Sequence, residues 1–220
     1  MKLVLASGSQ RRRELLTMCG YDYEIIVSNA DETIDENDPE SFVRALSFRK
    51  AKEVFDRLFA AGRRDFAVIG SDTVVAFQKE GETKPVIIGK PKDAEDAVCI
   101  LSMLSGKTHR VFTGVSVIAD IPDENAAAQC SIREKAEIQT ECSITEVTFE
   151  TLSPDEITDY VNSGDPLDKA GSYGIQGPFG MFVREIRGNY FTVIGMPIPV
   201  LYKMLKKIGI LPHGFYERIE

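Results

Sequence analysis

Blocks of hydrophobic and polar residues alternate along the chain, and they predict strands and helices that alternate in the same order. A short apolar stretch opens the sequence and predicts a buried strand over residues 1–6. Ser9 is a natural N-cap residue, and an apolar stripe follows it as far as Gly20, so a helix is expected between these two positions. The first unit of the fold is therefore a strand followed by a helix.

The same signals divide the rest of the chain. A helix is expected from the Asp38 cap and Pro39 to about Ala61, a second after Asp93, and a third after Ser153. Apolar or alternating segments predict further strands, and the last apolar stripe predicts a closing helix over residues 197–208. The strands are expected at residues 23–27, 66–77, 86–88, 111–117, 136–149 and 182–186.

This order of elements predicts one domain of mixed α/β or α+β class over residues 1–220, without internal repeats or linkers. Residues 120–135 are small and polar and are expected to form a hairpin excursion from the sheet. A glycine-rich stretch over residues 163–180 is expected to be a loop between elements.

Composition narrows the function. The net charge is −8 and the isoelectric point is near 5.0, which argues against broad binding to nucleic acid or to an anionic membrane. The four cysteines lack paired spacing, and no segment reads as a signal peptide or membrane span, so a reduced, cytoplasmic setting is expected. With only two histidines, any metal is expected to be held by carboxylates.

Three consecutive arginines, Arg11 to Arg13, begin the first predicted helix. Cations are unfavourable at a helix N-terminus, where the backbone N–H groups carry partial positive charge. A bound anion would remove this conflict, so the strand, small-residue loop and cationic helix start suggest a phosphate site, although the P-loop ending is missing. A solvated basic face is an equally good reading of this stretch alone.

Asp72 interrupts an otherwise apolar strand, in "VIGSDTVVAF". A carboxylate on a rigid strand is suited to hold Mg²⁺ or to activate a water molecule. The alternative is an aspartate at a strand end that accepts backbone hydrogen bonds. For Glu32, Lys50 and Lys90 the residue pattern alone favours ordinary roles: a solvated carboxylate, a lysine whose stem packs at the edge of a helix face, and a surface lysine before proline.

Taken in order, the motifs resemble the Maf family of nucleoside triphosphate pyrophosphatases. The resemblance spans nearly the whole chain and rests on "LASGSQRRREL", "DE" at residues 31–32, "FRKA", "GSDTVV", "GKPKDAEDA", "LSGKTHRVFTGV", "PLDKAGSYGIQG" and "GNYFTVIGMP". It implies a Maf/Ham1-like fold with a curved mixed sheet, two lobes around a nucleotide cleft, and a homodimer. It also implies a metal-dependent reaction in which water attacks the α-phosphorus and pyrophosphate leaves.

The resemblance also assigns roles to residues. It implies that Ser7, Arg11 and Arg12 bind phosphates, that Glu32 and Asp72 hold the metal and the water, and that Lys50 and Lys90 neutralise developing charge. Asp72 is the implied general base. The metal is expected to be Mg²⁺, with Mn²⁺ or Co²⁺ as alternatives.

The branch that acts on dTTP and UTP is similar to this sequence at the selectivity positions Arg12, Thr73 and Gln176. The amide of Gln176 has a donor and an acceptor, which suit the paired carbonyl and N–H of uracil or thymine. Two alternatives remain open at this point. One is a pyrophosphatase for noncanonical purine or 7-methylguanosine triphosphates, and the other is a nonenzymatic nucleotide-binding regulator of cell division.

Overall fold

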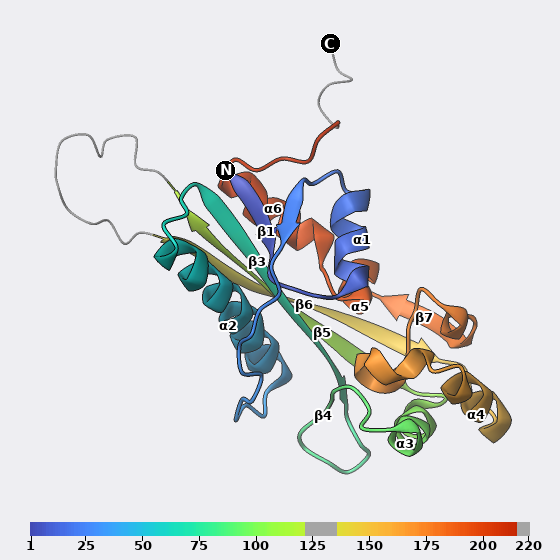
Figure 1. Cartoon of the computed structure of the whole chain (residues 1–220). Coiled ribbons are helices and arrows are strands. Elements are labelled where there is room, and N and C mark those ends of the chain that lie inside the picture. Colours follow the sequence, from blue (N-terminus) through green and yellow to red (C-terminus); the bar gives the residue numbers. More distant parts are fainter. Residues whose placement is uncertain (122–135, 215–220) are drawn as a thin grey trace, which may run out of the picture.

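The computed structural model describes residues 1–121 and 136–214, in which a seven-stranded mixed sheet is covered by helices on both faces (Figure 1). The strand order is β2-β1-β3-β5-β6-β7, and β4 pairs with the far end of β3. Strands β1, β2 and β3 are parallel to one another and the other pairs are antiparallel. The predicted mixed α/β class is confirmed. The strands are β1 (Lys2–Leu5), β2 (Tyr23–Ile25), β3 (Phe66–Phe77), β4 (Val86–Ile88), β5 (Thr108–Asp120), β6 (Ala136–Phe149) and β7 (Val183–Arg187).

The helices form on capping signals that are visible in the sequence. The side chain of Asp38 accepts a hydrogen bond from the Ser41 amide, and Ser153 and Glu156 form a reciprocal capping box. In the part of the chain that the structure describes, no helix is both long and apolar enough to cross a membrane. The helices are α1 (Gln10–Met18), α2 (Pro39–Ala60), α3 (Ala94–Leu104), α4 (Pro154–Asn162), α5 (Tyr190–Ile194) and α6 (Ile198–Lys207).

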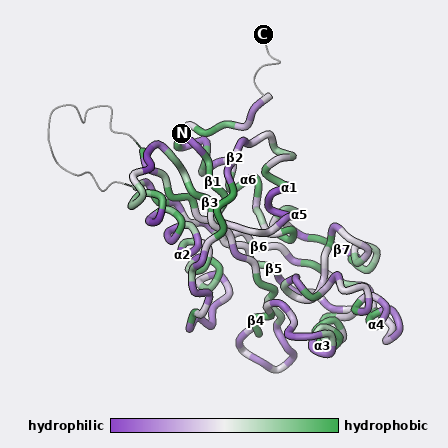
Figure 2. The backbone as a smooth tube through the Cα atoms, in the orientation of Figure 1, coloured by the Kyte–Doolittle hydropathy of each residue, from purple (hydrophilic) through white to green (hydrophobic). Residues whose placement is uncertain are grey.

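Each face of the sheet has its own helices. Alternate residues of β1 and of the position after it point to opposite faces, so Leu3 and Leu5 pack among residues of α1 and α6, whereas Val4 and the following Ala6 pack against α2. Figure 1 shows α2 on one side of the long strands, with α1, α5 and α6 on the other. Figure 2 shows the hydrophobic residues concentrated in these central strands. The long strands β3 and β5 therefore hold both hydrophobic layers together.

Some elements differ from the sequence-based predictions. Helix α5 was not predicted, and the glycine-rich stretch contains three short 3-10 turns, Asp165–Asp168, Ala170–Ser172 and Pro178–Phe182. Strand β5 does not alternate between buried and exposed positions, because helices cover both of its faces. Most of the expected excursion, residues 122–135, lies outside the described residues.

Helix α2 lies unusually close to the sheet because two glycines face it. A Cβ atom on Gly70 would come within 2.2 Å of the Ser47 carbonyl oxygen, and one on Gly114 would come equally close to the Val43 carbonyl oxygen. Any other residue at these positions would push the helix away. The two glycines therefore set the distance at which side chains of α2 meet those of β3.

The edge of β3 is open between its two neighbours. Strand β1 pairs with Phe66 to Ile69, and β4 pairs only with Val75 to Phe77. The Ala6 amide donates to the Ile69 carbonyl at 2.8 Å, so by strand alternation the backbone groups of Ser71 and Thr73 also face this side, where no strand among the described residues is paired with them. The fold thus leaves a gap in the sheet around Asp72.

His109 is a buried titratable residue of the core. Its ring is 2% exposed, packs edge-on against Phe149 and Tyr173, and lies 2.9 Å through Nε2 from the Tyr173 hydroxyl. Burial lowers the pKa of His109 to about 3. The unfolded chain therefore binds a proton here that the folded chain does not, between pH 6.5 and 3.

This difference predicts that His109 lowers the free energy of unfolding in acid. The destabilising effect of His109 should be absent above about pH 6.5 and should grow as the pH falls. It should lower the free energy of unfolding by about 2 kcal/mol between pH 7 and pH 5. Denaturant unfolding of His109→Gln should show a pH dependence that is smaller by this amount, with the exposed His213→Gln as the control for loss of a histidine. The same pH dependence in His109→Gln and in the unsubstituted protein would contradict the prediction.

Candidate active site

A cavity of about 1840 Å³ opens at the gap in the edge of β3. It reaches both faces of the sheet, because neighbouring residues of a strand point in opposite directions: Asp72 points toward α2, and Thr73 points toward α1 and α5. All nine residues that the sequence analysis proposed for the site line this one cavity. They are Ser7, Arg11, Arg12, Glu32, Lys50, Asp72, Thr73, Lys90 and Gln176.

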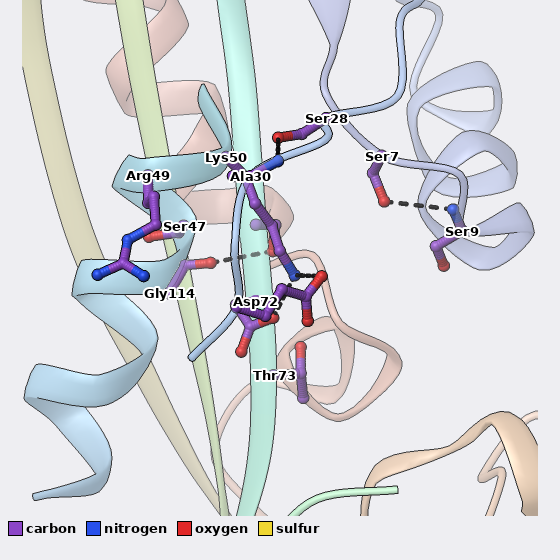
Figure 3. Close-up of polar contacts among 12 residues, drawn as sticks. Ser7, Ser9, Ser28, Ala30, Ser47, Arg49, Lys50, Asp72, Thr73 and Gly114 are labelled. Atoms are coloured by element: carbon purple, nitrogen blue, oxygen red, sulfur yellow. Dashed lines mark hydrogen bonds and ion pairs between the residues drawn. The ribbon is translucent and has the colours of Figure 1, made fainter. Parts of the chain in front are cut away.

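On the α2 face, one lysine lies between two carboxylates. The Nζ atom of Lys50 is 2.7 Å from Asp72 Oδ1 and 2.9 Å from Glu32 Oε1, and the lysine and aspartate side chains are each only 12% exposed. Figure 3 shows Lys50 reaching from α2 to Asp72 on β3. The interpretation of Lys50 as a lysine that only packs its stem at the helix edge is therefore wrong. It is a largely buried cation that is paired with two acidic groups.

On the other face, Arg12 is held at three of its nitrogen atoms. Nε donates to the Gly195 carbonyl at 2.9 Å, Nη1 donates to the Ser7 hydroxyl at 3.1 Å, and Nη2 donates to the Thr73 hydroxyl at 3.4 Å. Burial lowers the pKa of Arg12, and the Asp72 carboxylate opposes this effect. A guanidinium remains charged in proteins, so Arg12 presents a fixed positive charge to the cavity.

The start of α1 combines these cations with free backbone donors. Ser9 is the N-cap residue but its side chain makes no capping hydrogen bond, and its own amide donates to Ser7 Oγ at 3.2 Å (Figure 3). The first turn has no acidic residue. The first amides of the helix therefore have no side-chain cap from Ser9, and they are free to bind an anion. Arg13 is not simply solvated, because it donates to the Gly8 carbonyl at 3.0 Å.

A chain of ion pairs connects this helix with the glycine-rich segment. Arg11 lies 3.2 Å from Asp168, and Lys169 contacts both Asp168 at 2.7 Å and Asp165 at 3.0 Å. Burial raises the pKa of Asp168, but Lys169 and Arg11 together bring it below its usual value. The Tyr160 hydroxyl also holds the glycine-rich segment, because it accepts a hydrogen bond from the Gly174 amide at 3.1 Å.

The supported loop carries Gln176, which is exposed at the cavity wall two residues after Gly174. Lys169 packs against Gly174 so closely that a Cβ atom there would come within 2.7 Å of its side chain. Lys90 is exposed on the β4 side of the cavity, and the amide of Gly171 donates to the Gly89 carbonyl at 3.0 Å. Gln176 and Lys90 therefore lie on segments that contact each other directly.

The carboxylates fit a Mg²⁺ ion that is shared with a ligand. Within residues 1–121 and 136–214 no group of three or more acidic, histidine or cysteine side chains is placed to enclose a metal. Mg²⁺ is commonly bound by one or two carboxylates, with waters and substrate phosphates completing its shell. Glu32 and Asp72 use one oxygen each on Lys50, so each carboxylate has a second oxygen for a metal.

Sequence reasoning did not assign the roles that three supporting residues have in the structure. Gly195 has φ of +108° and turns its carbonyl onto Arg12, and Asp168 and Lys169 hold the glycine-rich segment against Arg11. The signal for Gly195 was present in "YFTVIGMP", where a glycine follows the five residues that form α5. The ion pair between Arg11 and Asp168 joins residues 157 positions apart, and no local pattern indicates it.

Comparison with known proteins identifies the fold and the family of this chain. The structure matches a solved Staphylococcus aureus Ham1 protein with a TM-score of 0.51 at 16% identity, over 94% of this chain and 99% of that one. The expected Ham1-like fold is thereby confirmed. Residues 2–208 match the family model described as Maf-like protein, and the chain belongs to that family.

Curated relatives are similar over almost their full lengths. A protein of Agathobacter rectalis, named dTTP/UTP pyrophosphatase, is 40% identical over 95% of this chain and 98% of its own. Proteins with the same name from Bacillus thuringiensis subsp. konkukian and Bacillus anthracis are 42% identical, over 95% of this chain and 96% of theirs. The family resemblance that the sequence motifs indicated is confirmed.

Proposed function

We propose that this protein hydrolyses dTTP and UTP to the nucleoside monophosphates and pyrophosphate. The relatives at about 40% identity bear the name of this activity. The observation that carries the proposal is the position of Lys50 between Asp72 and Glu32, next to a cradle of arginines in the same cavity. The cavity is large enough for a nucleotide, and it supplies both cations for the phosphates and carboxylates for the chemistry.

The phosphate end of the substrate is assigned to the start of α1. Ser7, Arg11 and Arg12 offer donors from three side chains, and the first backbone amides of the helix add their partial positive charge. Arg11 would leave its contact with Asp168 to bind a phosphate oxygen. Lys90, on the opposite wall, adds a cation near the phosphate that leaves.

The reacting end is assigned to the α2 face. Asp72 holds the attacking water and accepts its proton, because its carboxylate lies on a rigid strand at the cavity floor. Lys50 keeps Asp72 and Glu32 in place and opposes the charge that develops on the α-phosphate. A Mg²⁺, Mn²⁺ or Co²⁺ ion held by Glu32 and Asp72 would neutralise phosphate charge.

Pyrophosphate release from a panel of dTTP, UTP, CTP, 7-methyl-GTP, ITP and ATP tests the proposal, with Mg²⁺ and with a chelator. We expect metal-dependent release that is fastest with dTTP and UTP. Fastest release from 7-methyl-GTP or ITP would replace the proposed substrates with purine nucleotides. Binding of these nucleotides without release would instead favour a nonenzymatic regulator.

Replacement of Gln176 by alanine is expected to relax the choice of base. The exposed amide of Gln176 can pair with the carbonyl and N–H of uracil or thymine, and this pairing is worth roughly 10- to 100-fold in discrimination. The ratio of kcat/KM for dTTP to that for CTP should therefore fall by about this factor in Gln176→Ala. Equal losses on both nucleotides would contradict a role in base choice.

We also assign the protein to the cytoplasm. The described cysteines Cys19, Cys99 and Cys142 are free thiols, as is usual in a reducing compartment. Nucleoside triphosphates are available to an enzyme in that compartment.

A further inference from the structure

A line of hydroxyl groups runs from Arg12 into the core of the protein. Arg12 Nη2 is 3.4 Å from Thr73 Oγ1, Thr73 Oγ1 is 3.0 Å from Thr113 Oγ1, and Thr113 Oγ1 is 2.7 Å from the Thr192 carbonyl oxygen. Thr113 lies on β5, is fully buried, and does not line the cavity. Neither the sequence motifs nor the site described above assigns it a function.

The direction of each hydrogen bond follows from the two ends of this line. A carbonyl oxygen can only accept, so Thr113 uses its one hydroxyl proton on Thr192. The bond between the two threonines must then be donated by Thr73, whose own proton is used in turn. Thr73 is left with lone pairs, and one of them accepts from the Arg12 guanidinium, which has only donors.

The opposite direction is unfavourable at the buried end. If Thr113 donated to Thr73, its oxygen would lie 2.7 Å from the Thr192 carbonyl oxygen without a proton between them. Buried polar atoms of the same sign at this distance repel each other strongly in a low dielectric. Thr113 therefore fixes the direction of these hydrogen bonds. Thr73 can accept a hydrogen bond from Arg12, but it has no proton left to donate to a ligand.

We propose that Thr113 is a positioning residue, which sets the proton direction in Thr73 and thereby orients Arg12 toward the substrate phosphates. With Nε on Gly195, Nη1 on Ser7 and Nη2 on Thr73, the guanidinium plane is fixed. One N–H on each of the two terminal nitrogens remains for an anion. The proposal rests on the function proposed above, because it concerns how that site holds its substrate.

Rates of dTTP hydrolysis by three protein variants test this role. Thr113→Val removes the hydroxyl at almost constant volume and frees the Thr73 proton to turn toward Arg12, so kcat/KM should fall by roughly 10- to 100-fold. Thr113→Ser keeps the hydroxyl and should restore activity to within about threefold of the unsubstituted protein. Thr145→Val is the matched control, because Thr145 is also buried and donates to a backbone carbonyl, of Asn189, at 3.0 Å without contacting Arg12.

A double-mutant cycle separates positioning from general destabilisation. In an Arg12→Lys background the guanidinium is already lost, so adding Thr113→Val should change kcat/KM less than about twofold. The same loss in both backgrounds, or an equal loss in Thr145→Val, would overturn the proposal. If Thr113→Val does not fold, Thr73→Val removes the other hydroxyl of the same hydrogen bond at a half-buried position. Its effect on kcat/KM should likewise be non-additive with Arg12→Lys.

Calorimetric binding of dTTP distinguishes this proposal from the proposed function. If the unsubstituted protein binds dTTP but does not hydrolyse it, the proposed function fails, while weaker binding by Thr113→Val that Thr113→Ser restores still supports the positioning role. Hydrolysis by the unsubstituted protein together with unchanged binding and turnover in Thr113→Val would overturn the positioning role alone. Absence of both binding and turnover in the unsubstituted protein would overturn both.

Discussion

Replacing Asp72 with asparagine is expected to lower kcat for dTTP hydrolysis by about 10³-fold or more. The substitution keeps the shape of the side chain on β3 but removes its ability to accept a proton from water and its charge toward a metal. Asp72 is buried beside Lys50, and β3 has no second acidic residue that could take its place. Steady-state pyrophosphate release with saturating dTTP measures the effect.

The control for this variant is Asp56→Asn on the exposed side of α2, where Asp56 pairs with Lys52. We expect it to retain full activity. Thermal melting of both variants should show that the fold is intact, since neither change alters side-chain volume and Lys50 keeps its ion pair with Glu32 in Asp72→Asn. Turnover by Asp72→Asn at the rate of the unsubstituted protein would refute the assignment of the base.

Replacing Lys50 with methionine is expected to lower kcat by roughly 10²- to 10³-fold, the usual effect of removing one fixed group that stabilises transition-state charge. Methionine fits the largely buried position, which is 12% exposed, but leaves Asp72 and Glu32 without the cation that separates them. The loss should appear in kcat more than in KM, because Lys50 contacts the catalytic carboxylates and the phosphate cradle lies on the other face of β3.

Lys52→Met provides the comparison for this variant, since Lys52 lies on the same helix and forms an exposed pair with Asp56. It should have little effect on kcat or stability, as is usual for surface ion pairs. A Lys50→Met protein with normal kcat would show that the cation between the carboxylates serves folding instead of catalysis.

The sequence predicted most of the fold because local signals determine most of the elements. Asp38 followed by proline, and Ser153 followed by Glu156, define their helix starts directly in the chain. The strand at Phe66–Phe77 has the bounds that its apolar run predicted. Helix α5 was missed because its five residues are too short to show a helical period, and contacts with the sheet stabilise it.

The site was predictable in its members but not in its geometry. Motifs named the nine residues, yet Lys50 looked like a helix-edge lysine because its partners, Glu32 and Asp72, lie 18 and 22 residues away. Their meeting depends on Gly70 and Gly114, which let α2 approach the sheet. The role proposed for Thr113 was not predictable for a similar reason, because its hydroxyl donates to a carbonyl 79 residues away.

Hydrolysis of dTTP in ¹⁸O-labelled water tests the central claim most directly, namely that the Asp72 side of the cavity delivers water to the α-phosphorus while the arginines hold the phosphates that leave. Mass spectrometry of the products should place one labelled oxygen in the thymidine monophosphate and none in the pyrophosphate. Label in the pyrophosphate, or release of orthophosphate in place of pyrophosphate, would show attack at another phosphorus and would contradict the account.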